Sequence, residues 1–144
     1  MENAMNILLA VDGSAASDRA TKHVVQLSKQ FAKPPKLTLV NVSLPLLKAA
    51  SNKLGRKATA EYYDSNSEYA AHKARRMLQR AKLEFTEVFL VGEPADEIAR
   101  HADKHEADLI VMGSRGQTAL KSLLLGSVAT KVLAQSKVPL TVIR

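Results

Sequence analysis

The chain begins with a short apolar segment that ends in a turn. Residues 5–12 read Met-Asn-Ile-Leu-Leu-Ala-Val-Asp, and Gly13 and Ser14 follow. An apolar run of this length, without regular polar alternation, is typical of a strand that is buried on both faces of a parallel sheet. The sequence therefore predicts a buried first strand that is closed by Asp12 and a turn.

The residues after this turn have helical periodicity. Apolar side chains recur at spacings of 4, 3 and 4, which define one face of a helix: Ala20, Val24, Leu27 and Phe31. Pro34 and Pro35 end this helix. Residues 36–42 then predict a second strand, so the chain opens as strand, helix, strand.

The middle of the chain combines a segment without periodicity and a long helix. Residues 43–59 follow neither a helical nor a strand pattern, and an irregular connection of this length is usually functional or disordered. We expect a mobile loop there. Over residues 61–83, apolar side chains at helical spacing predict one long helix whose other face is basic: Tyr62, Tyr69, Ala70, Ala74, Met77, Leu78 and Ala81.

The last part of the chain continues the alternation of strands and helices. Strands are predicted over residues 84–91, 108–112 and 138–143. Helices are predicted over 94–105 and 119–136, the second with a break at Gly126. Five strands that alternate with four helical segments indicate one α/β domain over residues 1–144, with a parallel sheet.

Composition narrows the possible chemistry. The chain has no cysteine, which excludes disulfides, thiolate metal sites and cysteine nucleophiles. Aromatic residues make up only 4% and tryptophan is absent, so the core is expected to be aliphatic. No apolar run approaches the roughly 18 residues of a membrane span, and the N-terminal segment lacks the features of a signal peptide. We expect a cytoplasmic protein that does not bind membranes.

The net charge of +7 is concentrated in one part of the chain. Residues 44–83 carry nine basic side chains against three acidic ones. The tyrosines of this segment, at the start of the predicted helix, include two at the spacing expected for core packing. Aromatic side chains that bind nucleic acid by stacking are exposed and interleaved with basic ones. We therefore expect no specific nucleic-acid binding.

Two glycine-containing segments carry the strongest chemical signal. Met112-Gly-Ser-Arg-Gly116 follows a predicted strand, and Gly126-Ser127-Val128 lies at the start of the last helical stretch. Glycines allow the backbone to approach a ligand, and the free N–H groups of a helix start attract anions. Arg115 adds a full positive charge. The spacing is also compatible with glycines that only shape a turn and break a helix.

Other sites have less support. The chain contains neither Gly-x4-Gly-Lys-Ser/Thr nor Gly-x-Gly-x-x-Gly, so a P-loop enzyme or a dinucleotide dehydrogenase is disfavoured. It has no Gly-x-Ser-x-Gly hydrolase motif. His101 and His105 are four residues apart on a predicted helix, but the glutamate of a His-Glu-x-x-His zinc motif is absent. We expect no catalytic residue and no dedicated metal ligands.

The full-length pattern resembles the universal stress protein family, in the nucleotide-binding branch with Gly-x2-Gly-x9-Gly-Ser/Thr. The resemblance rests on five segments: Ile7–Ser14, Val40–Val42, Val91–Pro94, Asp108–Gly116 and Lys137–Ile143. It implies a Rossmann-like parallel sheet of order 3-2-1-4-5 with helices on both faces. The first and fourth strands then meet at the topological switch point, where open α/β sheets bind ligands.

The resemblance also assigns roles to individual residues. Asp12 would contact the adenosine part of a nucleotide, with Ala10 and Val11 lining its pocket, and the backbone of Val42 would recognise adenine. The phosphates would lie against a loop and a helix start: Gly113, Arg115, Gly116, Gly126, Ser127 and Val128. Met112 would also line the nucleotide site. Asp12 could instead cap the first helix, and the Val42 side chain could pack in the core.

The implied function is regulatory binding of ATP, accompanied by Mg²⁺, with little or no turnover. Lys48, Lys53, Arg56 and Lys57 of the expected loop would raise the positive potential over the nucleotide site. A slow ATPase or autophosphorylating protein remains an alternative, as does a partner-binding protein with a vestigial pocket. The resemblance further implies a homodimer formed through the C-terminal strand.

Overall fold

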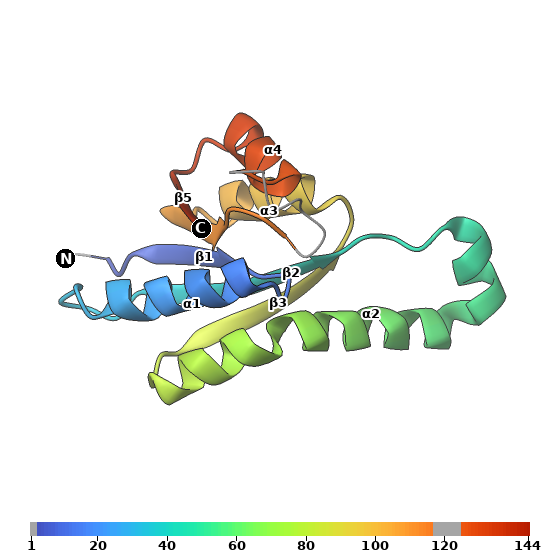
Figure 1. The fold of residues 1–144 in the computed structure, drawn as a ribbon, viewed down its shortest axis with the longest axis horizontal. Coiled ribbons are helices and arrows are strands. Elements are labelled where there is room, and N and C mark those ends of the chain that lie inside the picture. The colour runs from blue at the N-terminus through green and yellow to red at the C-terminus, as the bar shows by residue number, and fades with distance from the viewer. Residues whose placement is uncertain (1–2, 117–124) are drawn as a thin grey trace.

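The computed structural model describes residues 3–116 and 125–144. Strands and helices alternate along the chain (Figure 1). The strands are β1 (Asn6–Ala10), β2 (Lys36–Ser43), β3 (Phe85–Val91), β4 (Leu109–Gly113) and β5 (Leu140–Ile143). The helices are α1 (Ala15–Ser28), α2 (Lys48–Arg80), α3 (Pro94–Lys104) and α4 (Ser127–Gln135). Residues 119–124 of the last predicted helix lie outside the described residues.

The five strands form one parallel sheet in the order β3-β2-β1-β4-β5. This confirms the predicted α/β fold and strand order. The chain moves outward from β1 through β2 to β3, and then returns to the other side of β1 to form β4 and β5. The direction of the connections therefore reverses between β1 and β4.

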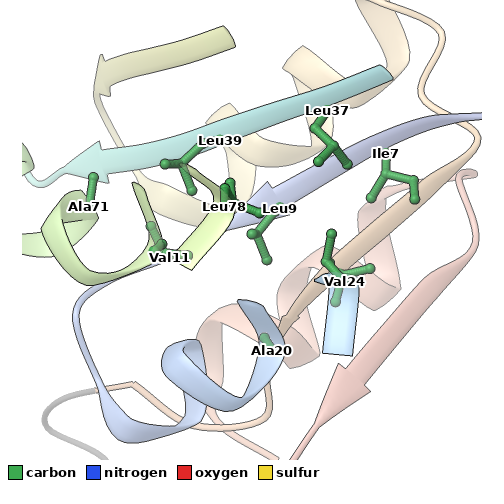
Figure 2. Close-up of a cluster of buried hydrophobic side chains, with 11 residues drawn as sticks. Ile7, Leu9, Val11, Ala20, Val24, Leu37, Leu39, Ala71 and Leu78 are labelled. Carbon is green, nitrogen blue, oxygen red and sulfur yellow. The ribbon is translucent and has the colours of Figure 1, made fainter. Parts of the chain in front are cut away.

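The sheet is covered by helices on both faces. Ile7 and Leu9 of β1 belong to a core cluster with residues of α1 and α2, which Figure 2 shows in close-up. Leu8 and Ala10 belong to a second cluster with residues of α3 and α4. Because successive side chains of a strand point to opposite faces, double coverage explains why β1 is continuously apolar.

The segment 43–59 is not the loop that the sequence predicts. β2 extends to Ser43 and α2 begins at Lys48, so most of the segment is helical. The helix is interrupted at Gly55, whose φ of 85° and ψ of 171° are not helical. We call residues 44–62 the arm, because they project away from the body of the protein (Figure 1).

The arm has no periodicity because it has almost no buried face. Most of its side chains are exposed, including Leu47 and Leu54. Its inner contacts are mainly polar: the Tyr63 hydroxyl accepts a hydrogen bond from the Leu46 N–H at 2.9 Å. Its helical residues are mostly alanine, lysine, leucine and arginine, which have high intrinsic helix propensity. Periodicity reports burial, so it cannot detect a helix that lies outside the core.

The tyrosines of α2 do not pack in the core as predicted. Tyr62 is 45% exposed and Tyr69 is 74% exposed. The buried positions of this helix are small or aliphatic: Ser67, Ala70, Ala71, Ala74 and Leu78. Because this face lies against β2 and α1, small side chains fit the close approach where a tyrosine ring would not.

No helix among residues 3–116 and 125–144 is both long enough and apolar enough to cross a membrane.

We predict that Leu78→Ala destabilises the protein by about 2–5 kcal/mol, because this fully buried side chain fills the core between α2 and the sheet. Urea unfolding measures the loss. Leu47→Ala is the control, since Leu47 is 81% exposed; its effect should stay within about 0.5 kcal/mol. Equal effects of the two substitutions would contradict the packing of α2 described above.

Candidate functional site

A cavity of about 440 Å³ opens at the carboxyl ends of β1, β2 and β4. It lies where the direction of the connections reverses, which is the position expected for a ligand site in an open α/β sheet. All eleven site residues that the sequence predicts line it: Ala10, Val11, Asp12, Val42, Met112, Gly113, Arg115, Gly116, Gly126, Ser127 and Val128. The structure thus brings together segments that are more than a hundred residues apart.

Further lining residues escaped the sequence analysis. They are Ser17, Val40, Asn41, Pro94, Ile98, Ser114 and Ala129. Ser114 lies inside the glycine motif, so its position could have indicated it. Val40, Asn41 and Pro94 lie in segments on which the family resemblance rests, but they received no role there. The remaining residues lie in no such segment, and only the packing of α1, α3 and α4 against the strands identifies them: Ser17, Ile98 and Ala129.

One wall of the cavity is apolar. Ala10, Met112 and Ala129 are buried members of the cluster under α3 and α4, and Val42 packs against the same cluster. Val42 therefore has the core-packing role that the sequence left open, while it also faces the cavity. An apolar wall of this kind suits a flat ring that has to leave water.

The opposite wall is formed by closely packed backbone. A Cβ atom at Gly116 would lie 2.7 Å from Asp12 Oδ2, and one at Gly126 would lie 3.1 Å from the Ser114 carbonyl oxygen. The Gly126 N–H also donates a hydrogen bond to this carbonyl. A side chain at Gly116 would therefore displace the Asp12 carboxylate, and one at Gly126 would press on the backbone of Ser114 and Arg115.

Asp12 orders the turn between β1 and α1. Its Oδ1 accepts hydrogen bonds from the Ser14 N–H at 2.9 Å and from the Ser17 hydroxyl at 2.8 Å. The N-cap of α1 is Ser14, whose side chain accepts from the Ser17 N–H. Asp12 therefore supports the start of α1 without being its N-cap, and its second carboxylate oxygen lies beside Gly116.

Two helices begin at the cavity. Pro94 at the start of α3 and Ser127 at the start of α4 both line it. A helix N-terminus carries a partial positive charge of roughly half an elementary charge and unpaired N–H groups. The start of α3 is already capped, because Pro94 has no N–H and the Asp96 N–H donates to the Glu93 carboxylate. The start of α4, together with Arg115, makes its side of the cavity favourable for an anion.

The other candidate residues lie away from the cavity. His101 and His105 stack on α3 with ring centroids 4.1 Å apart, and neither is among the described lining residues. Burial lowers the pKa of His101, and the neighbouring His105 and Lys104 lower it further. Among the described residues no group of three or more His, Cys, Asp or Glu side chains could hold a metal ion.

Four basic residues of the segment that the sequence predicts as a loop also do not line the cavity. Lys48, Lys53, Arg56 and Lys57 all belong to the arm. The predicted effect of these residues on the potential over the site therefore rests on long-range electrostatics and stays a prediction.

A buried polar network connects the cavity to α2. The Asn41 side chain, which lines the cavity, donates a hydrogen bond to the Val11 carbonyl at 2.7 Å and accepts one from the Ser67 hydroxyl at 3.0 Å. Asn66 donates to the Ser43 hydroxyl at 2.7 Å. These bonds tie the carboxyl ends of β1 and β2 to the middle of α2.

Comparison with known proteins identifies relatives over the whole length. The model of the universal stress protein family matches residues 3–144. Universal stress protein MJ0531 of Methanocaldococcus jannaschii is 33% identical over 96% of this chain and 81% of its own length. Universal stress protein MJ0577 of the same organism is 30% identical over 96% of this chain and 93% of its own.

Solved structures share the fold. The structure of MJ0577 aligns with a TM-score of 0.79 at 27% identity and covers 96% of this chain and 94% of its own. A universal stress protein in complex with cAMP aligns with a TM-score of 0.72 at 23% identity over 99% of each chain. The universal stress protein from Archaeoglobus fulgidus in complex with dAMP aligns with a TM-score of 0.71 at 22% identity and covers 97% of this chain and 98% of its own.

We predict that Asn41→Ala destabilises the protein by about 1–3 kcal/mol, because it leaves the Val11 carbonyl and the Ser67 hydroxyl without these bonds in a buried place. Urea unfolding measures this loss, and Asn52→Ala on the exposed side of the arm is the control. In a double-mutant cycle with Ser67→Ala, the two substitutions should be non-additive. Strict additivity would contradict the coupling between cavity and α2.

Proposed function

The chain belongs to the universal stress protein family, and from this premise we propose that it binds an adenine nucleotide, foremost ATP, in the cavity between β1 and β4. Binding is regulatory, as part of a cellular stress response, with little or no turnover. The observation that carries the proposal is the convergence of eleven predicted residues on one cavity.

The character of the two walls supports a nucleotide in particular. The apolar wall beside Val42 and Met112 suits a purine ring, whereas the start of α4 and Arg115 suit phosphates. A volume of about 440 Å³ is within the range of ordinary small-molecule sites. The complexes of related folds with cAMP and dAMP add support for an adenine ligand.

The glycine spacing supports our proposal that the chain belongs to the nucleotide-binding branch of the family. Gly113, Gly116, Gly126 and Ser127 satisfy the pattern, and the last three line the side of the cavity that favours an anion. Gly113 ends β4 and also packs against Ala16 of α1. The glycines therefore combine the structural role that the sequence left open with access of the backbone to phosphates.

Mg²⁺ would accompany the phosphates. A magnesium ion at a nucleotide is commonly held by one or two carboxylates together with phosphate oxygens and water. Asp12 is the one carboxylate among the described lining residues, and because we assign it to the nucleoside, phosphate oxygens and water would hold the ion.

Regulatory binding is favoured over rapid hydrolysis. Efficient phosphoryl transfer requires held metal ions, a residue that orients the nucleophile and compensation of transition-state charge. Asp12 would have to serve the first two purposes while its Oδ1 accepts two hydrogen bonds. The enzyme alternative predicts sustained ADP formation that persists through rigorous purification, and a vestigial pocket predicts partner binding without nucleotide.

We predict that the double substitution Gly126→Val and Ser127→Ala weakens ATP binding at least about tenfold. It removes one hydroxyl and places a side chain against the Ser114 carbonyl and the Arg115 backbone. Isothermal calorimetry measures the affinity, which we expect to be micromolar or tighter in the parent protein. Ser136→Ala, at the other end of α4, is the matched control. A folded double variant that binds ATP as tightly as the parent would show that the anion site is elsewhere.

We predict that Asp12→Ala weakens the binding of adenosine and of ATP by a similar factor, because we assign Asp12 to the nucleoside. Calorimetry with both ligands compares the two losses. Asp12→Asn keeps an oxygen that can accept from Ser14 and Ser17, so it controls for disorder of the turn. If only ATP binding falls, Asp12 acts through the metal ion and the assignment is wrong.

We also predict a homodimer through β5, which lies at one edge of the sheet. The Pro139 and Ile143 carbonyls accept hydrogen bonds from β4, so the alternation of a strand turns the Val142 N–H toward the open edge. An exposed edge strand with apolar side chains has to be covered or paired. Val142→Pro should give a folded monomer in light scattering at tens of micromolar protein, and a persistent dimer would reject this interface.

A further inference from the structure

A second groove lies at the amino ends of the strands, whereas the nucleotide cavity lies at their carboxyl ends. It is formed by the end of α1, the connection that follows α1, and the end of α2, and its volume is about 510 Å³. Both helices end on the same side of the molecule (Figure 1), where β2 and β3 begin. The groove is therefore separate from the site discussed above.

The floor of the groove is apolar and half-buried. Val25, Phe31 and Leu83 line it and pack against the core cluster between the helices and the sheet, and Met77 lies beside them. The groove is thus the open end of this core. A straight hydrocarbon chain laid in it would bury apolar surface on both partners, and removing this surface from water favours binding.

The rim of the groove is positively charged. Lys22, Lys29 and Arg80 line it, and no acidic residue is among the described lining residues. None of these three cations takes part in an ion pair within the described part of the chain. The two helix C-termini contribute only about half a negative charge each, so the rim stays positive overall.

The groove has few other polar groups to offer. The Ser28 hydroxyl donates its hydrogen to the Val24 carbonyl. Backbone N–H groups along the wall are already used in the helix ends, namely those of Lys29, Phe31, Ala81 and Leu83. A sugar, a base or a peptide backbone would leave its own polar groups without partners here. The fitting ligand has an apolar body and one anionic end.

From this combination we propose that the groove binds a free medium-chain fatty carboxylate, with its chain along Val25, Phe31 and Met77 and its carboxylate at the three cations. The occupant follows from charge complementarity and from the absence of hydrogen-bonding groups on the floor. The volume of the groove is within the range of small-molecule sites. The proposal is independent of nucleotide binding.

Methionine methyl resonances can observe both sites in the intact protein. The chain has four methionines; Met77 lines the groove and Met112 lines the nucleotide cavity. We would titrate protein labelled with ¹³C in the methionine methyl groups with decanoate below its micelle concentration, and assign the Met77 signal with Met77→Leu. Decanoate should shift the Met77 signal saturably and leave the Met112 signal unchanged. ATP should leave the affinity for decanoate unchanged.

Charge variants test the rim. The triple variant Lys22→Gln, Lys29→Gln, Arg80→Gln should bind decanoate about tenfold more weakly. The triple variant Lys53→Gln, Arg56→Gln, Lys57→Gln removes the same charge from the arm and should bind it as the parent does. Decan-1-ol and decyltrimethylammonium should bind more weakly than decanoate. All variants replace exposed side chains, and circular dichroism checks their fold.

Three results would overturn the proposal. The first is that decanoate shifts the Met112 signal and not the Met77 signal. The second is that decan-1-ol binds as tightly as decanoate. The third is that the two triple variants lose equal affinity for decanoate. Since Met112 reports on ATP in the same spectra, failure at the groove is distinguishable from failure of the nucleotide site.

Discussion

A parallel sheet that is buried on both faces must be covered by helices on each side, because every strand presents apolar side chains alternately to the two faces. In this chain α1 and α2 cover one face and α3 and α4 the other. The change of face occurs where the chain returns past β1 to form β4. The connections leaving β1 and β4 therefore diverge, and the carboxyl ends of these strands stay uncovered. The cavity is a consequence of how the chain satisfies the sheet.

Burial also determines what could be predicted from the sequence. The sequence identified β1 because a strand buried on both faces is continuously apolar. It identified the glycine segments because glycine is needed where the backbone packs closely. The strand order, which the structure confirms, was instead implied by the family resemblance, as were the roles of Ala10, Val11 and Val42. The arm was missed because an exposed helix has no periodicity, and Tyr69 was misplaced because helical spacing alone does not say which face is buried. Asn41 lies in the segment Val40–Val42, but the resemblance assigned it no role, because its importance comes from partners 30 and 26 residues away.

The polar contacts of α2 give this helix two different parts. Near its middle, Ser67 is buried and bonded to Asn41, and through Asn41 to the end of β1. Towards its start, Leu46 of the arm is held to α2 by the hydrogen bond from its N–H to the Tyr63 hydroxyl. Few buried apolar side chains stabilise the arm, so it should open locally at a lower free energy than the rest of α2. A ligand that fixes the Val11 backbone would act on the rigid part first.

The folded structure divides the positive charge that the sequence concentrates between residues 44 and 83. Four of these cations lie on the arm, beyond the carboxyl ends of the strands, while Arg80 lies at the groove beside the amino ends of β2 and β3. Arg75 is held between Glu68 and Glu87, and its hydrogen bonds to these carboxylates raise its pKa above the usual value. The hydrogen bond from Arg75 to Glu68 also lowers the pKa of Glu68. Nucleic acid requires cations that follow a continuous backbone of phosphates. Here the cations are instead divided among the arm, the groove and ion pairs on α2, where Lys73 also lies 3.6 Å from Asp18.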